Sequence, residues 1–77
     1  MTELVDTIFS LLIRGESIVL ARVISVKGSS PRQVGASMVV RKGGEIAGTV
    51  GGGLIEAAVM QKASVLFDTQ GFTTLSF

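Results

Sequence analysis

An apolar, strand-like run and an amphipathic, helix-like run are joined by Gly48-Thr49-Val50-Gly51-Gly52-Gly53-Leu54-Ile55-Glu56. A glycine inside a regular element costs about 0.5–1 kcal/mol relative to alanine, so three in succession need a structural reason. A backbone without β-carbons can come close to a ligand or to another backbone segment. The glycines therefore predict either a binding loop or a tight corner between a strand and a helix, and their spacing leaves both open.

The start of a helix attracts anions, because its first N–H groups lack partners within the helix and its dipole leaves partial positive charge there. The glycine run is no P-loop, since the required Lys and hydroxyl are absent, and Gly48, Gly51 and Gly53 do not have the Gly-x-Gly-x-x-Gly spacing. Glu56 would lie in the first helical turn, where a carboxylate stabilises the helix by roughly 0.3–1 kcal/mol. Alternatively, Glu56 would accept hydrogen bonds from a ligand with N–H donors, such as a purine or a pterin.

The chain is small and unusually apolar. It has 77 residues, of which 47% are hydrophobic and 17% are charged, whereas an average soluble domain has roughly 25% charged residues. A chain of this length buries only about 60–65% of its unfolded surface. We therefore expect a single domain whose excess apolar surface faces another copy of the chain or a further domain.

Composition also excludes several functions. Seven basic and six acidic residues give a net charge of +1 without basic clusters, which is not the pattern of a nucleic-acid-binding protein. The chain has no Cys and no His, which excludes disulfides, thiolate metal sites and Ser-His or Cys-His catalysis. It contains no apolar run of about 18 residues, and its first residues lack the basic start and cleavage site that are typical of a signal peptide. We expect a cytoplasmic protein that is not an enzyme and has no membrane span.

Hydrophobic periodicity gives the order of elements α-β-β-β-α-β. Residues 17–27 are apolar on both faces, which predicts a central strand covered on both sides, and Gly43-Gly44 predicts a hairpin turn. The fold class is α+β, a small mixed or mainly antiparallel sheet with two helices. The pattern predicts helices over residues 2–14 and 54–69 and strands over residues 17–27, 37–42, 45–50 and 72–77.

A polar loop over residues 28–36 carries the other candidate ligand-binding side chains. Arg32 follows Pro31 there, and its guanidinium suits bidentate contact with a phosphate or carboxylate. Ser29 and Ser30 add hydroxyl donors. A solvated loop arginine is the plainer interpretation. The functional one gains weight because this loop and the glycine run, joined by one hairpin, can lie at the same edge of a sheet.

These motifs together resemble a known family. Gly28-Ser29-Ser30-Pro31-Arg32, Gly35-Ala36-Ser37-Met38 and Gly48 to Glu56 are similar, in order and spacing, to the N-terminal domain of the XdhC/CoxI family. The resemblance implies an accessory protein that binds molybdenum cofactor (molybdopterin) and protects it during sulfuration. It also implies insertion of the cofactor into xanthine dehydrogenase-type enzymes. Implied partners are a molybdenum hydroxylase, a cofactor sulfurase and a second copy of the chain in a dimer.

The resemblance assigns cofactor binding to residues in both loops. Arg32 would pair with the phosphate, with Ser29 and Ser30 as further donors, and Glu56 would accept N–H donors of the pterin. Gly51, Gly52, Gly53 and the helix start would hold the phosphate or dithiolene end. Family members continue into a segment with Gly and Cys and a Rossmann-like domain, so we expect residues 1–77 to be one domain of a longer protein.

One alternative from a different class remains open. The domain could be a dimerisation or interaction module without a ligand of its own, in which the glycines serve packing only. A nucleotide-binding enzyme fragment is the weakest interpretation, because the sequence offers no base, nucleophile or metal set.

Overall fold

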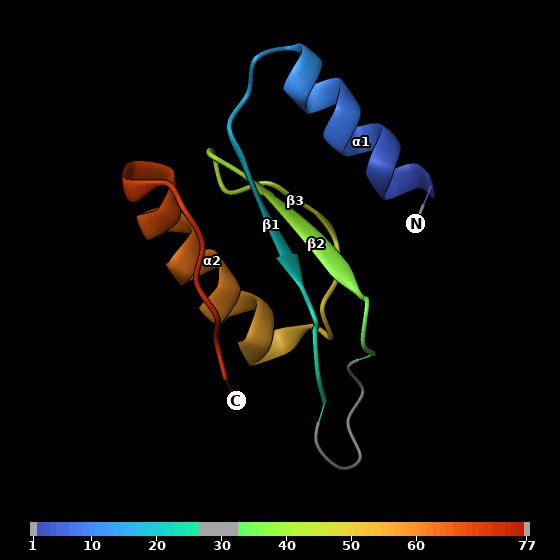
Figure 1. Cartoon of the computed structure of the whole chain (residues 1–77), viewed down its shortest axis with the longest axis vertical. Coiled ribbons are helices and arrows are strands. Elements are labelled where there is room, and N and C mark those ends of the chain that lie inside the picture. Colours follow the sequence, from blue (N-terminus) through green and yellow to red (C-terminus); the bar gives the residue numbers. More distant parts are fainter. Residues whose placement is uncertain (1, 27–32, 77) are drawn as a thin grey trace.

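The computed structural model describes residues 2–26 and 33–76 and confirms the α+β class. Within these residues the sheet is antiparallel, with its strands in the spatial order β1-β2-β3 (Figure 1). Both predicted helices and the hairpin are present. In chain order the elements are α1 (Thr2–Ile13), β1 (Ile18–Arg22), β2 (Ser37–Arg41), β3 (Ile46–Gly48) and α2 (Gly53–Thr69).

The β2–β3 hairpin turns where the paired glycines predicted. The Gly44 N–H donates to the Arg41 carbonyl at 2.9 Å, and the Arg41 N–H donates to the Glu45 carbonyl at 2.8 Å. Gly44 has a φ of 94°, in the left-handed region that favours glycine. A three-residue loop that ends on a left-handed glycine is a common way to join two antiparallel strands.

The central strand is β2, so the prediction that residues 17–27 form it was wrong. Residues Ser37 to Val40 of β2 are all buried, whereas Leu20 of β1 is 54% exposed. β1 lies at the edge of the described sheet and pairs only with β2 there. Apolar residues on both faces of a strand therefore do not show that it is central, because part of β1 is apolar and yet uncovered.

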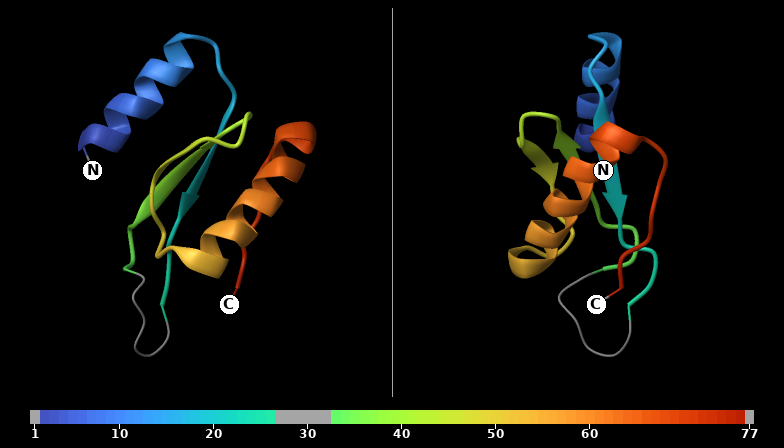
Figure 2. Two further views of the ribbon diagram at one scale, coloured as in Figure 1. Left: turned by 180° about the vertical axis from the view of Figure 1, so that it is seen from behind. Right: turned by 90° about the vertical axis from the view of Figure 1, so that its left-hand side faces the viewer.

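The two helices cover opposite faces of the sheet (Figure 2). Met38 and Val40 of β2 point to one face, where they form a core with residues of α2 and with Val50. Val39 points to the other face, where it and Leu11 of α1 are buried. The alternation along β2 thus splits the small core between two layers.

The predicted strand over residues 72–77 is not formed. Residues 72–76 contain no strand, Phe77 lies outside the described residues, and Phe72 is 93% exposed. This segment runs back alongside α2 (Figures 1 and 2). Its alternating sequence is suitable for a strand, but a strand also needs a neighbour with free backbone donors and acceptors, and no ladder partner engages it within the described part.

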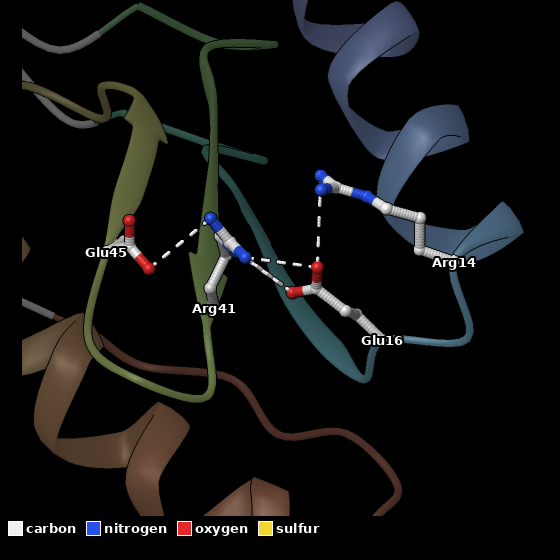
Figure 3. A network of polar contacts seen from close by, with 4 residues as sticks. All are labelled: Arg14, Glu16, Arg41 and Glu45. Carbon is white, nitrogen blue, oxygen red and sulfur yellow. Dashed lines mark hydrogen bonds and ion pairs between the residues drawn. The ribbon is translucent and has the colours of Figure 1, made fainter.

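A cluster of ion pairs holds the α1–β1 connection against the hairpin (Figure 3). Gly15 ends the helix, and the N–H groups of Gly15 and Glu16 donate to the carbonyls of Leu12 and Leu11, both at 3.0 Å. This turn places Glu16 against Arg41, whose Nε and Nη2 donate to the two carboxylate oxygens at 3.0 Å each.

Two further charged residues complete the cluster. Arg41 Nη1 lies 3.3 Å from Glu45 Oε1, and Arg14 Nη2 lies 3.8 Å from Glu16 Oε2. The Arg41 and Glu16 side chains are 32% and 29% exposed, whereas that of Glu45 is 71% exposed. The inner pair is therefore partly shielded from solvent, and the outer contacts are not.

Large apolar side chains remain on the surface, in keeping with the composition. The most exposed are Leu54 and Phe72, at 89% and 93%. On α1, Val5, Phe9 and Leu12 are 54%, 64% and 55% exposed, and their spacing places them along one stripe of the helix. None of the described helices is long and apolar enough to cross a membrane.

Candidate functional site

The chain segments that the sequence singled out lie at one end of the sheet, the end where β1 and β3 finish and β2 begins. The register pairs Met38 with Gly48 and Arg22 with Ser37, so the end of β3, the start of β2 and the end of β1 lie together (Figure 1). The glycine run leaves the sheet from this end. The described residues just before 27 and just after 32 follow β1 and precede β2, so they lie at the same end of the sheet as the glycine run.

Gly48 is the glycine that the packing requires. Its φ is 80°, and an added β-carbon would meet the backbone carbonyl oxygen of Ser37 at well under 3.0 Å. Only glycine allows this approach without a shift of backbone. The tight-corner interpretation of the sequence therefore applies to Gly48, at the last residue of β3.

Gly51, Gly52 and Gly53 serve a different purpose. Their φ values are 122°, 79° and 55°, all in the range where other residues are strained. An added β-carbon at Gly52 or Gly53 would meet no atom within 4 Å. The conformation of the loop requires these two glycines, and the space beside them is open.

The loop is folded around the carboxylate of Glu56. Glu56 Oε2 accepts hydrogen bonds from the Thr49 hydroxyl, from the Val50 N–H at 3.2 Å and from the Gly52 N–H at 3.1 Å. The Gly51 N–H donates to Thr49 Oγ1 at 3.2 Å. The N–H groups of Val50, Gly51 and Gly52 therefore all have acceptors within the chain. As in a capping box, a glutamate in the first turn of the helix accepts from the backbone that precedes the helix.

These bonds lower the pKa of Glu56. The Thr49 hydroxyl lowers the pKa most, burial raises it, and the N–H groups of Val50 and Gly52 lower it further. Hydrogen bonds donated to a carboxylate favour its charged form. Glu56 is therefore an anion at neutral pH, and the loop already contains the charge that its amides attract.

Unused groups remain beside this carboxylate. Glu56 Oε1 has no hydrogen-bond partner in the described part of the chain, and neither do the N–H groups of Gly53, Leu54 and Ile55 in the first turn of α2. An acceptor and several donors thus lie within one helical turn. This arrangement suits a ligand that presents both N–H donors and an anionic or acceptor group, better than it suits a bare phosphate.

Comparison with known proteins gives the family. The model of the XdhC and CoxI family matches residues 11–77. The chain belongs to this family. The resemblance drawn from the sequence motifs is therefore confirmed.

Two curated relatives illustrate the family. Over 68 residues, 88% of the chain, it is 38% identical to a protein of Bacillus subtilis (strain 168) whose name describes a probable subunit of xanthine dehydrogenase. Over 52 residues, 68% of the chain, it is 40% identical to the molybdenum cofactor insertion chaperone PaoD of Escherichia coli (strain K12). The aligned parts cover 21% and 16% of those proteins, so the chain spans about a fifth of their length or less. No solved structure shows significant similarity to the chain.

The residues predicted from the sequence and the family resemblance fall into two groups. Gly51, Gly52, Gly53 and Glu56 are brought together in the loop described above. Ser29, Ser30 and Arg32 lie outside the described residues, so their assignment stays a prediction. The strand ends on either side of them are at the same end of the sheet as the glycine loop, as the sequence argument expected.

Arg22, at the end of β1, is a further cation near the glycine loop, and it was not among the candidates selected from the sequence. Its Nε donates to Ser37 Oγ at 3.3 Å, and Ser37 Oγ donates to the Gly35 carbonyl at 3.2 Å. No carboxylate among the described residues pairs with it. Its place as a charged residue inside the apolar run at 17–27 was the signal that could have identified it.

A groove of about 490 Å³ adjoins the glycine loop, between β1, α2 and the segment after α2. Val50 and Ile55 line its end nearest the loop, and Arg22 and Lys62 are its charged residues. Its volume is in the range of small-molecule sites. An extended ligand bound at Glu56 would therefore have an adjoining surface with apolar walls and two cations.

Proposed function

We propose that this chain is the part of an accessory protein that binds molybdenum cofactor and assists its sulfuration and insertion into xanthine dehydrogenase-type enzymes. Family membership and the name of the Escherichia coli relative, a molybdenum cofactor insertion chaperone, support a role in molybdoenzyme maturation. The chain would carry the cofactor in the cytoplasm as cargo and perform no catalysis itself. Its partners would be the target hydroxylase and the cofactor sulfurase.

The observation that carries the proposal is that, among the described residues, Glu56 Oε1 and the first amides of α2 have no hydrogen-bond partner. A molybdopterin presents N–H donors on its pterin ring and a phosphate at its other end. Glu56 would accept from the pterin, and the loop at Gly51 to Gly53 with the start of α2 would hold the phosphate or dithiolene end. Arg32 would pair with the phosphate, and Ser29 and Ser30 would add donors.

The direct test measures binding of isolated molybdenum cofactor to the chain and to two variants, Arg32→Ala and Glu56→Ala. We expect each variant to weaken binding at least about tenfold, because each removes a charged hydrogen-bonding partner. Glu45→Ala is the matched control, since it removes an exposed carboxylate at the other end of the hairpin. Binding like the unaltered chain by both Arg32→Ala and Glu56→Ala would contradict the assignment.

A second candidate function, a dimerisation or interaction module, is favoured by the exposed stripe of Val5, Phe9 and Leu12 on α1. Covering such a stripe with a second copy would remove apolar area from water. Sedimentation velocity over a range of concentrations tests this idea with Phe9→Glu as the disrupting variant. A stable monomer for the unaltered chain would count against it, whereas a dimer lost in Phe9→Glu would support it.

A further inference from the structure

We propose that Thr49 is a positioning residue of the candidate site, whose hydroxyl fixes the Glu56 carboxylate across the glycine loop and keeps one of its oxygens for the ligand. This inference rests on the proposed function and deepens it. Thr49 itself would touch no ligand. It would act through Glu56, by deciding which oxygen is used inside the chain and which is left.

The hydrogen-bond directions around Thr49 carry the argument. A hydroxyl has one proton to donate and lone pairs to accept. Here its proton goes to Glu56 Oε2, and a lone pair accepts from the Gly51 N–H at 3.2 Å. Thr49 is the only side chain in the described residues that bonds both to the carboxylate and to the glycine backbone.

The consequence for Glu56 is an unequal use of its two oxygens. Within the described part of the chain, the bonds from Thr49, Val50 and Gly52 all go to Oε2. With its donors concentrated on one oxygen, the carboxylate is held in one orientation and Oε1 stays an acceptor. Without the hydroxyl, the carboxylate would keep two amide donors and gain freedom to rotate, and the Gly51 amide would lose its acceptor.

Ligand selectivity follows from the same arrangement. The amides of Val50, Gly51 and Gly52 are already satisfied, so an incoming anion has to use the first turn of α2 instead. A free phosphate would find donors only in the first turn of α2, from Gly53 onward, and would meet the charge of Glu56 beside them. A ligand with N–H donors next to an acceptor group would be favoured over inorganic phosphate.

Two substitutions at Thr49 separate its hydroxyl from its shape. Thr49→Val is close to isosteric but has no hydroxyl, and Thr49→Ser keeps the hydroxyl and loses a methyl group. Because Thr49 is exposed, neither change disturbs the core. Titration of the Glu56 carboxyl by ¹³C NMR and binding of isolated molybdenum cofactor are measured on both variants.

In Thr49→Val we expect the pKa of Glu56 to rise, the amide resonances of Val50 and Gly52 to shift, and cofactor affinity to fall about tenfold. Thr49→Ser should resemble the unaltered chain in all three measurements. An unchanged Glu56 titration in Thr49→Val would overturn the positioning role. A changed titration with unchanged cofactor affinity would overturn its importance for the ligand.

The two proposals fail in different ways. If the unaltered chain binds no cofactor, the proposed function is wrong, and the titration alone decides whether Thr49 holds the carboxylate. If cofactor binds and inorganic phosphate competes with it as strongly as a pterin without phosphate does, the selectivity argued from the loop is wrong.

Discussion

Glu16 and Glu56 are both held against the β2–β3 hairpin, but at its two ends and by different kinds of donor. Glu16 meets the guanidinium of Arg41, whose two nitrogens reach both carboxylate oxygens. Glu56 meets a hydroxyl and two backbone amides, and all of them reach one oxygen. The first carboxylate is neutralised by a charged guanidinium, whereas the partners of the second among the described residues are uncharged dipoles.

This difference is the reason for proposing a ligand site at the glycine-loop end of the hairpin and not at its turn end. At the turn end, the guanidinium of Arg41 donates to both oxygens of Glu16, so the cluster has a structural role. At the glycine-loop end, the charged Glu56 has one oxygen without a partner among the described residues, beside helix amides that likewise have none there. Carboxylates paired with arginine are frequent in structural roles, whereas one held by amides in an open loop is the better candidate for recognition.

The largest expected effect contrasts the glycines at the two ends. Gly48→Ala should lower the free energy of unfolding by about 3 kcal/mol, the sum of left-handed strain and of overlap with the Ser37 backbone. Gly44→Ala should cost only about 1–2 kcal/mol, because its β-carbon would meet open space. Urea denaturation of both variants measures the difference. Equal losses would show that the close approach at Gly48 is not what requires glycine.

An intermediate effect is expected from acid at the glycine-loop end. The folded chain holds the pKa of Glu56 below its usual value of 4.5, so this carboxylate adds stability above that value. The contribution is lost as the pH falls through the lower folded pKa. The stability difference between the unaltered chain and Glu56→Gln should therefore be full above about pH 5 and should shrink on acidification. A pH-independent difference between the two unfolding curves would contradict this.

The smallest effects are expected at the ion-pair end. A double-mutant cycle of Glu16→Gln and Arg41→Met should give a coupling of about 1 kcal/mol that weakens in 1 M salt, since the pair is only partly shielded. Glu45→Ala should change stability by less than about 0.5 kcal/mol, because its contact is exposed. A coupling that salt leaves unchanged would indicate that the pair is better shielded than its exposure implies.

The sequence predicted the larger features of this fold, because they depend on local patterns. Helical spacing, the Gly43-Gly44 turn and the α+β class could all be read from neighbouring residues. The central strand could not be identified in this way, since β1 is apolar on both faces without being covered on both. The strand expected after α2 failed for a related reason, because a strand requires a partner that local sequence does not specify.

The sequence singled out the glycine run and Glu56, which the structure brings together, but it could not predict the hydrogen bonds between them. The sequence offered packing and binding as rival explanations for one run of glycines. The structure shows close packing at Gly48, and binding at the glycines at 51–53 stays a proposal. Likewise, helix stabilisation and ligand contact were rival roles for Glu56. The two oxygens of Glu56 allow both roles, because the Thr49 hydroxyl contacts only Oε2. Residue spacing cannot reveal which of the two oxygens a hydroxyl contacts.

The carboxylate inside the glycine loop has a consequence for entropy. Three adjacent glycines have the largest conformational freedom of any tripeptide in the unfolded chain, and ordering them is correspondingly unfavourable. Because Glu56 and Thr49 order this segment during folding, a ligand that arrives later does not have to. A loop that is already rigid before binding raises the affinity for a ligand without any additional contact. A small domain can thus present an ordered loop in the part of its sequence that is intrinsically most flexible.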